Sequence, residues 1–375
     1  MLTKCGTTGS DAIAEASDKA QFYAMNPLQR LGITIPIVQA PMAGVSTPEM
    51  AAAVSNAGGL GSIAVGATNA AGARAMIEGV RARTAHAFNV NVFVHATPQA
   101  DVEREQEWME ALRPTFRTFG MEPPGALTTI YQSFADDDEM LKTLVETAPP
   151  LVSFHFGIPS EDRIAALRSA GCMLIASATT LAEARLVEAA GLDAVVAQGW
   201  EAGGHRGVFD PSALDDQLSV AVLTRLLVTQ TSLPVIAAGG IMDGAGIRAA
   251  LDLGAVAAQL GTAFIACPES SADESYRDVL ASESAHHTIM ISAISGRPAR
   301  CLANRFTRWA SENSLTPPDY PIAYDAGKAL NAAAKAKGEH GYGAHWAGQG
   351  APLSRAMSAR ALIETLWKEA SEGRS

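Results

Sequence analysis

A repeating alternation of short apolar runs and alanine-rich amphipathic segments is the feature that most restricts how this chain can fold. From residue 31 onward, each apolar run leads into a loop of small and polar residues, then a segment with helical periodicity, then a glycine. The glycines Gly58, Gly171, Gly191 and Gly254 suit the left-handed position that often ends a helix. Repeated strand–helix units of this kind predict parallel strands.

The pattern predicts eight strands, at about residues 35–40, 60–65, 88–94, 151–155, 172–177, 193–198, 234–238 and 255–260. Eight strands separated by helices favour an α/β fold of the closed TIM (β/α)8 barrel type, with an open doubly wound sheet as the lesser alternative. The repeat is interrupted between the third and fourth strands by a proline-rich and acidic stretch, residues 113–148. Because residues 127–131 are β-prone, we expect a short extra strand near 126–131.

After the eighth predicted strand the repeat breaks, which indicates a second unit. We expect a helix over 273–281, a β-prone stretch over 288–294 and a helix over 322–336. The amphipathic segment 353–370 is typical of the last helix of the barrel. The predicted domains are therefore an N-terminal extension (1–26), a barrel (27–266 and 346–375) and a small, mostly helical subdomain inserted after strand eight (267–345).

Charge and cysteine content restrict the class of partner. The formal net charge of −11 disfavours nucleic acid and anionic membranes as principal partners. The four cysteines are scattered without metal-ligand spacing, so we expect no structural metal and a reducing, cytoplasmic location. No apolar run approaches the ~18 residues that span a bilayer.

Polar and small residues gather at the predicted strand ends. The sixth strand leads into Gln198 and a glycine-dense loop that ends in His205, Arg206 and Gly207. Since the carboxyl ends of barrel strands meet at one mouth, where ligands bind, these groups predict a site there. A flexible glycine-rich surface loop is the alternative interpretation.

The last two strand ends predict an anion site. Gly239 and Gly240 follow the seventh strand, and Gly261 and Thr262 follow the eighth. In TIM barrels, these two loops often bind phosphate through unpaired backbone N–H groups. A phosphate site implies a phosphorylated substrate or a cofactor such as FMN, whose ring has edges that suit amide side chains like Asn91, Gln198 and Gln259.

His155 is the candidate catalytic residue. It lies at the end of the fourth predicted strand between Phe154 and Phe156, so burial favours the neutral imidazole, which can accept a proton near neutral pH. His205 and Arg206 are candidates for contact with substrate or phosphate. Ser295 is a further candidate, in a segment (295–300) for which folding over the mouth and an exposed turn are equal alternatives. A histidine that is satisfied by a backbone carbonyl is the alternative for His155.

With these residues identified, the chain resembles the class I nitronate monooxygenases, formerly called 2-nitropropane dioxygenases. The resemblance covers about residues 27–367. The matching motifs recur in order at the strand ends: Gln39-Ala-Pro-Met-Ala-Gly44, Asn56-Ala-Gly-Gly-Leu-Gly61, Asn91, Ser153-Phe-His-Phe-Gly157, Ser177-Ala-Thr-Thr180, the segment Gln198 to Gly207, Ala238-Gly-Gly-Ile241 and Gln259-Leu-Gly-Thr262.

The resemblance implies a barrel that holds non-covalent FMN and oxidises alkyl nitronates, and nitroalkanes, with O2 to a carbonyl compound and nitrite. His155 matches the family's active-site histidine, as base or anion-stabilising group. The implied FMN contacts are Ala40, Pro41, Met42, Asn91, Gln198, Gly203, Gly239, Gly240, Gln259, Leu260, Gly261 and Thr262. The expected partners are a small nitronate or nitroalkane and O2, and the expected assembly is a monomer or homodimer.

Two departures from the family pattern concern the substrate. Residues 63–67 replace a loop that usually contains glycine and tyrosine, and Trp200 fills a normally small position near the presumed substrate. An FMN-dependent, NAD(P)H-using enoyl-thioester reductase is the alternative on the same fold. A flavin-binding module without turnover is the alternative outside enzymes.

Overall fold

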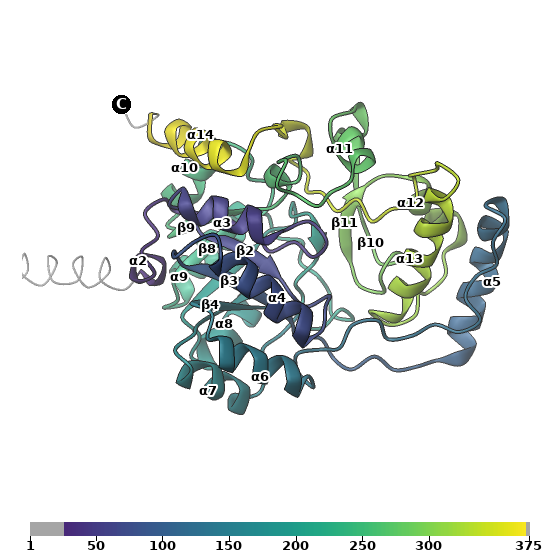
Figure 1. Ribbon diagram of the computed structural model, residues 1–375, viewed down its shortest axis with the longest axis horizontal. Coiled ribbons are helices and arrows are strands. Elements are labelled where there is room, and N and C mark those ends of the chain that lie inside the picture. Colours follow the sequence, from purple (N-terminus) through teal and green to yellow (C-terminus); the bar gives the residue numbers. More distant parts are fainter. Residues whose placement is uncertain (1–25, 373–375) are drawn as a thin grey trace, which may run out of the picture.

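The computed structural model describes residues 26–372. The predicted extension over residues 1–26 therefore lies, apart from Asn26, outside the described residues. Within them, a barrel and a smaller unit stand side by side, with the smaller unit at one end of the barrel (Figure 1).

Eight parallel strands form the barrel, and their positions confirm the sequence prediction. They are β1 (Ile37–Gln39), β2 (Gly61–Ala64), β3 (Phe88–Phe93), β4 (Leu151–His155), β5 (Met173–Ala178), β6 (Ala194–Gln198), β8 (Val235–Ala238) and β9 (Ala257–Leu260). The order is β1-β9-β8-β6-β5-β4-β3-β2. A parallel bridge between Val38 and Leu60 joins the first and last strands, so the sheet closes into a TIM barrel.

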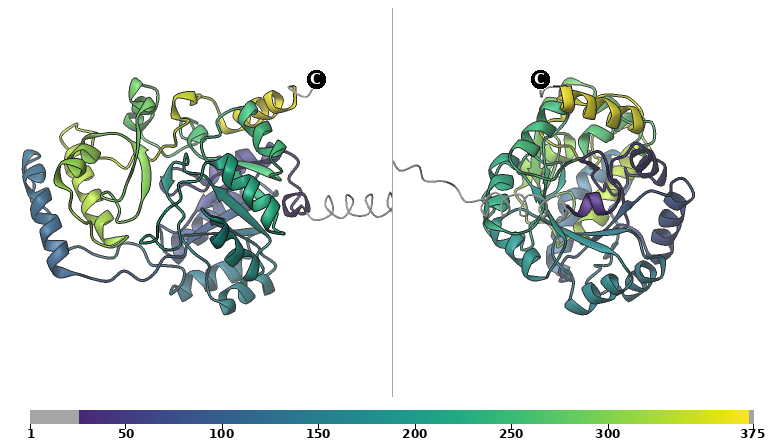
Figure 2. Two further views of the ribbon diagram at one scale, coloured as in Figure 1. Left: turned by 180° about the vertical axis from the view of Figure 1, so that it is seen from behind. Right: turned by 90° about the vertical axis from the view of Figure 1, so that its left-hand side faces the viewer.

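Helices surround the strands in a ring, which the view along the barrel shows (Figure 2). They are α3 (Pro48–Asn56), α4 (Ala70–Arg81), α6 (Asp138–Thr147), α7 (Glu161–Ser169), α8 (Leu181–Ala189), α9 (Val220–Gln230), α10 (Gly244–Asp252) and α14 (Ala359–Glu372), with the short α2 (Pro27–Arg30) before β1. Their starts are encoded locally. Thr47, Thr180 and Ser219 each accept a hydrogen bond from a backbone N–H of the first turn. All four predicted glycine ends have a positive φ.

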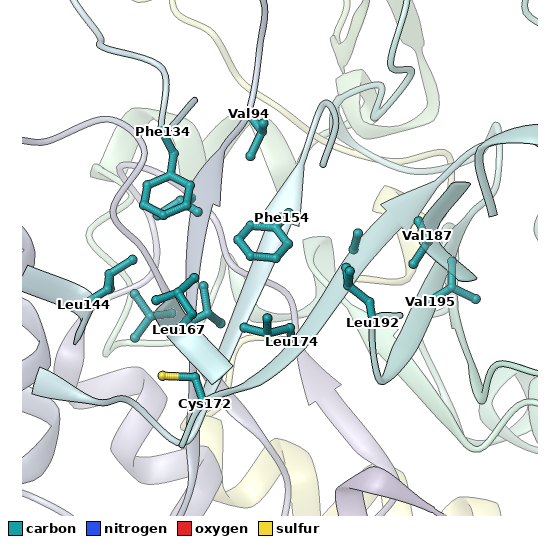
Figure 3. Close-up of a cluster of buried hydrophobic side chains, with 14 of the residues drawn as sticks. Val94, Phe134, Leu144, Phe154, Leu167, Cys172, Leu174, Val187, Leu192 and Val195 are labelled. Atoms are coloured by element: carbon teal, nitrogen blue, oxygen red, sulfur yellow. The ribbon is translucent and has the colours of Figure 1, made fainter. Parts of the chain in front are cut away.

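The barrel has two apolar layers. Between strands and helices, side chains such as Phe154, Leu167 and Leu174 form one large buried cluster (Figure 3). Inside the barrel, Ile175 and Val196 belong to a second. Strands buried on both faces are mostly apolar, so most of them could be recognised in the sequence as apolar runs.

The smaller unit combines a three-stranded antiparallel sheet with helices. The sheet has the order β10 (Thr288–Ile291), β11 (Ala299–Leu302), β7 (Gly204–His205). The helical elements are α11 (Glu274–Leu280), α12 (Arg305–Asn313) and α13 (Ile322–Lys335), with the 3₁₀ turns η1 (Thr262–Phe264), η2 (Glu283–His286) and η3 (Ala351–Leu353). Since β7 follows β6 directly, this sheet ties the barrel loop that carries His205 to the smaller unit.

The connection between β3 and β4 also joins the smaller unit. Its long helix α5 (Val102–Thr118) lies at the outer edge of the molecule beside α13 (Figure 1). There the Trp108 ring meets the Trp309 ring edge-on, with centroids 5.2 Å apart. The division at 267–345 stays a prediction, and it leaves out this helix.

The prediction of an extra strand near residues 126–131 is wrong. The segment is irregular and pairs with no strand of either sheet. Leu127 packs instead in the apolar cluster of the smaller unit, and the backbone N–H of Thr128 donates to Asp325 on α13.

No helix in the described part of the chain is long and apolar enough to cross a membrane. Over the same residues there is no cluster of three His, Cys, Asp or Glu side chains that could hold a metal.

Candidate active site

A cavity of about 530 Å³ lies at the carboxyl ends of the barrel strands, against the smaller unit. The strand ends predicted to meet do line it together. From the candidate set, the lining residues are Ala40, Pro41, Met42, Asn91, His155, Gln198, Gly203, His205, Gly239, Gly240, Gln259, Gly261 and Thr262. Leu260, Arg206 and Ser295 do not line it.

The glycine loops after β8 and β9 have the form of an anion cradle. Gly239 and Gly240 have φ angles of +133° and +67°, which side-chain-bearing residues rarely adopt. Among residues 26–372, the backbone N–H groups of Gly239, Gly240 and Gly261 donate no hydrogen bond to the protein. A Cβ on Gly261 would have only two neighbours within 4 Å, Ala40 Cβ at 3.5 Å and Met42 Sδ at 3.6 Å. Unpaired N–H groups on loops that line a cavity fit a phosphate.

The amide side chains differ in what they leave free. Asn91 donates from Nδ2 to Ser153 Oγ at 2.9 Å, while its Oδ1 accepts no hydrogen bond from the described residues. The side chain of Gln259 makes none either. Gln198, in contrast, donates to the His205 carbonyl at 3.0 Å and accepts from Gly207 N–H at 2.7 Å. Asn91 and Gln259 therefore have groups available for a flavin edge, whereas Gln198 holds the loop after β6.

His155 lies at the end of β4 with both ring nitrogens engaged. Nδ1 is 3.0 Å from Ser177 Oγ, and Nε2 is 3.1 Å from the backbone carbonyl oxygen of His205. Burial lowers the pKa of His155 to about 4, against the opposing effect of the His205 carbonyl, and the positive charges of Arg297 and Arg206 lower it further. The ring is neutral at pH 7, as the sequence predicted, and the carbonyl contact of the alternative interpretation is present as well.

His205 forms a second, half-buried imidazole beside that of His155. Its Nε2 lies 2.8 Å from Ser295 Oγ, and Ser295 is fully buried behind it. Burial lowers the pKa of His205 to about 3, helped by His155 and Arg297. Ser295 therefore contacts a cavity-lining ring without reaching the cavity.

Arg206 is placed differently from the sequence expectation of substrate contact. Its side chain is 1% exposed and bonds Asp215 through Nε at 2.7 Å and through Nη2 at 3.0 Å. It also donates to the Gln198 carbonyl oxygen at 2.5 Å. The Arg206 guanidinium is therefore already paired with a carboxylate. Its bond to the Gln198 carbonyl holds the loop after β6 against the end of β6.

Trp200 does not line the cavity, contrary to the expectation that it lies near substrate. The guanidinium groups of Arg206 and Arg300 lie 5.6 and 5.1 Å from the centre of its ring. The large side chain at this position therefore packs against two guanidinium groups outside the cavity.

Helix α13 contributes a wall of the cavity that was not predicted from the sequence. Tyr324, Lys328, Asn331 and Lys335 line the cavity, and their spacing of four, three and four residues places them on one helix face. The Lys328 ammonium lies 4.9 Å from the centre of the Tyr131 ring and 5.3 Å from that of Tyr324. The polar stripe could be recognised in the sequence of the predicted helix. The direction in which it faces could not.

Ser177 was also missed as a site residue. It sits on β5, lines the cavity and is half-buried. Its position opposite His155 depends on the parallel register that sets β4 beside β5, where Phe154 pairs with Ala176.

The chain is similar to known proteins along nearly its whole described length. A family model described as nitronate monooxygenase matches residues 26–369. A nitronate monooxygenase of Paraburkholderia phytofirmans is 60% identical over 354 residues, which are 94% of this chain and 96% of the relative. One from Pseudomonas aeruginosa is 55% identical over 340 residues, covering 90% of this chain and 97% of the relative.

Solved structures resemble the chain over its barrel and its smaller unit alike. The nitroalkane oxidase of Streptomyces ansochromogenes is 40% identical, with a TM-score of 0.84, and the match covers 93% of this chain and 99% of that one. FabK from Thermotoga maritima is 31% identical with a TM-score of 0.70, covering 92% and 94%.

Proposed function

The chain belongs to the nitronate monooxygenase family, and on that premise we propose that it oxidises alkyl nitronates, and nitroalkanes, with O2 to a carbonyl compound and nitrite. The proposal depends on one observation above all: a neutral histidine, His155, lines the same cavity as an anion cradle of glycine N–H groups. The first group suits proton transfer and the second suits a cofactor phosphate.

FMN is the cofactor we propose, because the cavity residues fit its two ends. The N–H groups of Gly239, Gly240 and Gly261 would hold the phosphate, and Asn91 and Gln259 would meet the ring edge. The rest of the proposed contact set is Ala40, Pro41, Met42, Gln198, Gly203, Leu260 and Thr262, of which Leu260 acts from behind the wall. When bound, the flavin would supply the electron acceptor for the nitronate and the route to O2.

Charge in the cavity suits an anionic substrate. Lys328 brings an ammonium group into the wall formed by α13, where the rings of Tyr131 and Tyr324 flank it. A nitronate beside His155 would favour the protonated ring and raise the pKa of the histidine from its value in the empty cavity. His155 would thereby act as base toward a neutral nitroalkane and hold the resulting anion.

Three further residues take proposed roles according to their place. His205 would contact substrate through its cavity-facing ring. Arg206 and Ser295 would act indirectly, Arg206 by fixing the loop and Ser295 by orienting the His205 ring. A small-molecule substrate, a monomeric or homodimeric assembly and a cytoplasmic location stay predictions.

Cofactor release and substrate oxidation test the proposal together. The purified protein should show a flavin spectrum, release FMN on heating, and consume O2 with propionate 3-nitronate and with 2-nitropropane. Anaerobic reduction of the flavin by a nitronate would support the oxygenase. Reduction by NADPH alone would support the enoyl-thioester reductase instead, and bound flavin with no turnover of any nitronate would support a binding module.

A further inference from the structure

The hydrogen bonds of His155 determine which ring nitrogen carries its proton. Nε2 faces the backbone carbonyl oxygen of His205 at 3.1 Å, and a carbonyl oxygen only accepts. Nε2 must therefore carry hydrogen and donate. In the neutral ring Nδ1 then has the lone pair, so the Ser177 hydroxyl, 3.0 Å away, donates to it.

The protein backbone holds this tautomer in place. The His205 carbonyl also accepts from Gln198 Nε2 at 3.0 Å, so both of its lone pairs are used. His205 itself pairs with Ala299 in the three-stranded sheet. Because Nε2 is committed to a fixed acceptor, Nδ1 is the one ring atom that can take up a proton.

Ser177 contacts that atom and, like His155, lines the cavity. Its side chain is half-buried and lines the cavity, and its hydroxyl hydrogen occupies the lone pair of Nδ1. A substrate proton can reach Nδ1 directly only if this hydroxyl moves away. A hydroxyl that is at once donor and acceptor can instead pass the proton on.

We propose that Ser177 relays the α-proton of a nitroalkane to His155. The substrate C–H bond breaks and its electron pair stays on the substrate as the nitronate. The serine Oγ takes that proton while its own proton moves to Nδ1, and the new Nδ1–H then donates back to Oγ. This step rests on the proposed function, and it needs neither an oxidant nor a cofactor.

The groups around His155 favour a short-lived imidazolium. The two charged groups that act on the ring are the guanidinium groups of Arg297 and Arg206, both positive. The other groups packed on it are Ser177, the neutral His205 and the aromatic rings of Phe93 and Phe156. With no carboxylate among these neighbours, the anionic product is the counter-charge that the protonated ring would find.

The test is exchange of the α-hydrogens of nitroethane in D2O, followed by NMR without O2. Wild-type protein should accelerate the exchange, and Ser177→Ala should lower the enzymatic rate about 10²-fold, as expected for loss of an acid–base group. Ser177→Thr, which keeps a hydroxyl, should restore much of it. His155→Asn should abolish it.

Thr179→Val is the matched control, because Thr179 lies just beyond the same strand, is fully buried and bonds Glu183 at 2.7 Å rather than the histidine. A rate in Ser177→Ala equal to or above that of wild type would overturn the relay, since the ring would then act directly. An equal loss in Thr179→Val would overturn it too, by showing a structural effect.

Two further readouts separate the relay from the function on which it rests. In the oxygen assay, Ser177→Ala should lower the ratio of kcat/KM for the nitroalkane to kcat/KM for its nitronate, because the nitronate has no proton to lose. In ¹⁵N NMR, the unprotonated Nδ1 of His155, assigned through His155→Asn, should shift in Ser177→Ala. If wild-type protein oxidises no nitronate, the proposed function fails, while the exchange reaction still decides the relay.

Discussion

The Arg297 guanidinium lies 4.4 Å from the centre of the ring of Phe156, the residue that follows His155. Arg297 is buried, and within residues 26–372 it forms no ion pair. An unpaired positive charge at this place disfavours a second positive charge on the histidines, and it contributes to the lowered pKa of both His155 and His205.

Replacing Arg297 should move the acid limb of the nitroalkane reaction. The active ring is neutral, so kcat/KM of the wild type should fall as the pH drops through about 4, the pKa of His155 in the empty enzyme. In Arg297→Gln the pKa of His155 should be higher, so the fall in kcat/KM on acidification should begin at a higher pH than in the wild type. Arg297→Lys, which keeps the charge, is the control. Identical profiles for the wild type and Arg297→Gln would contradict an electrostatic role.

His155→Asn should separate cofactor binding from proton transfer. The variant removes the ring but none of the glycine N–H groups, so we expect wild-type flavin content with a loss of about 10²- to 10⁴-fold in kcat/KM for 2-nitropropane. Oxygen uptake and the visible spectrum are the measurements. Unchanged turnover of the nitroalkane would remove His155 from its proposed role.

Gly261→Ala should weaken FMN binding without harming the fold. Gly261 has a φ of −109°, and its added Cβ would keep ordinary contact distances from the protein, so the variant should fold normally. The methyl group would project into the space left for the phosphate, and we expect about tenfold weaker FMN binding, or ~1.4 kcal/mol. Fluorescence titration of apoprotein measures this. Gly125→Ala, where the Cβ meets nothing within 4 Å and which lies outside the cavity, is the control.

Acid should destabilise the protein below pH 6.5 through its buried histidines. Burial lowers the pKa of His345 from 6.5 to about 4, so between these values the unfolded chain binds the extra proton. The stabilisation is complete above pH 6.5 and is lost as the pH falls toward 4, at about 1.4 kcal/mol per pH unit for one such group. His345→Phe should flatten the dependence. Urea unfolding at pH 5 and 7.5 checks it, and an unchanged difference between the two would be the contrary result.

Asp215→Ala should be strongly destabilising. It would leave the Arg206 guanidinium, 1% exposed, without its carboxylate, and breaking such a buried pair typically costs about 3–5 kcal/mol. The double variant Arg206→Met with Asp215→Ala should recover part of the loss, which a double-mutant cycle in urea measures. Glu364→Ala, which breaks an exposed pair with Arg360 at 3.5 Å, should cost much less.

The fold of the barrel was readable because its strands are buried on both faces. Runs such as residues 194–197 must be apolar throughout, and the caps and glycines between them mark the helix ends locally. The strand predicted at 126–131 was wrong because local β propensity was its only basis. A β-prone sequence becomes a strand only where it pairs with another strand, and in this segment Leu127 packs among side chains of the smaller unit instead.

The positions of some candidate site residues could be predicted from the sequence, and those of others could not. Residues fixed to strand ends, such as His155, Asn91 and Gln259, reach the cavity as predicted because the barrel brings all strand ends to one mouth. Arg206 and Ser295 do not, because Arg206 pairs with Asp215 and Ser295 lies buried behind the His205 ring. Sequence proximity to a site residue did not decide the direction of a side chain.

By itself, the sequence determined the strands, their parallel order and the glycines and polar groups at their carboxyl ends, since burial and backbone conformation act on each residue where it stands. The tertiary structure alone decided that α13 turns Tyr324 and Lys328 to the cavity, and that α5 packs beside it. It also decided that a carbonyl of β7 and a hydroxyl of β5 set the proton on His155. These are contacts between distant segments, and a hydrogen-bond partner is chosen by distance in space, which no local pattern contains.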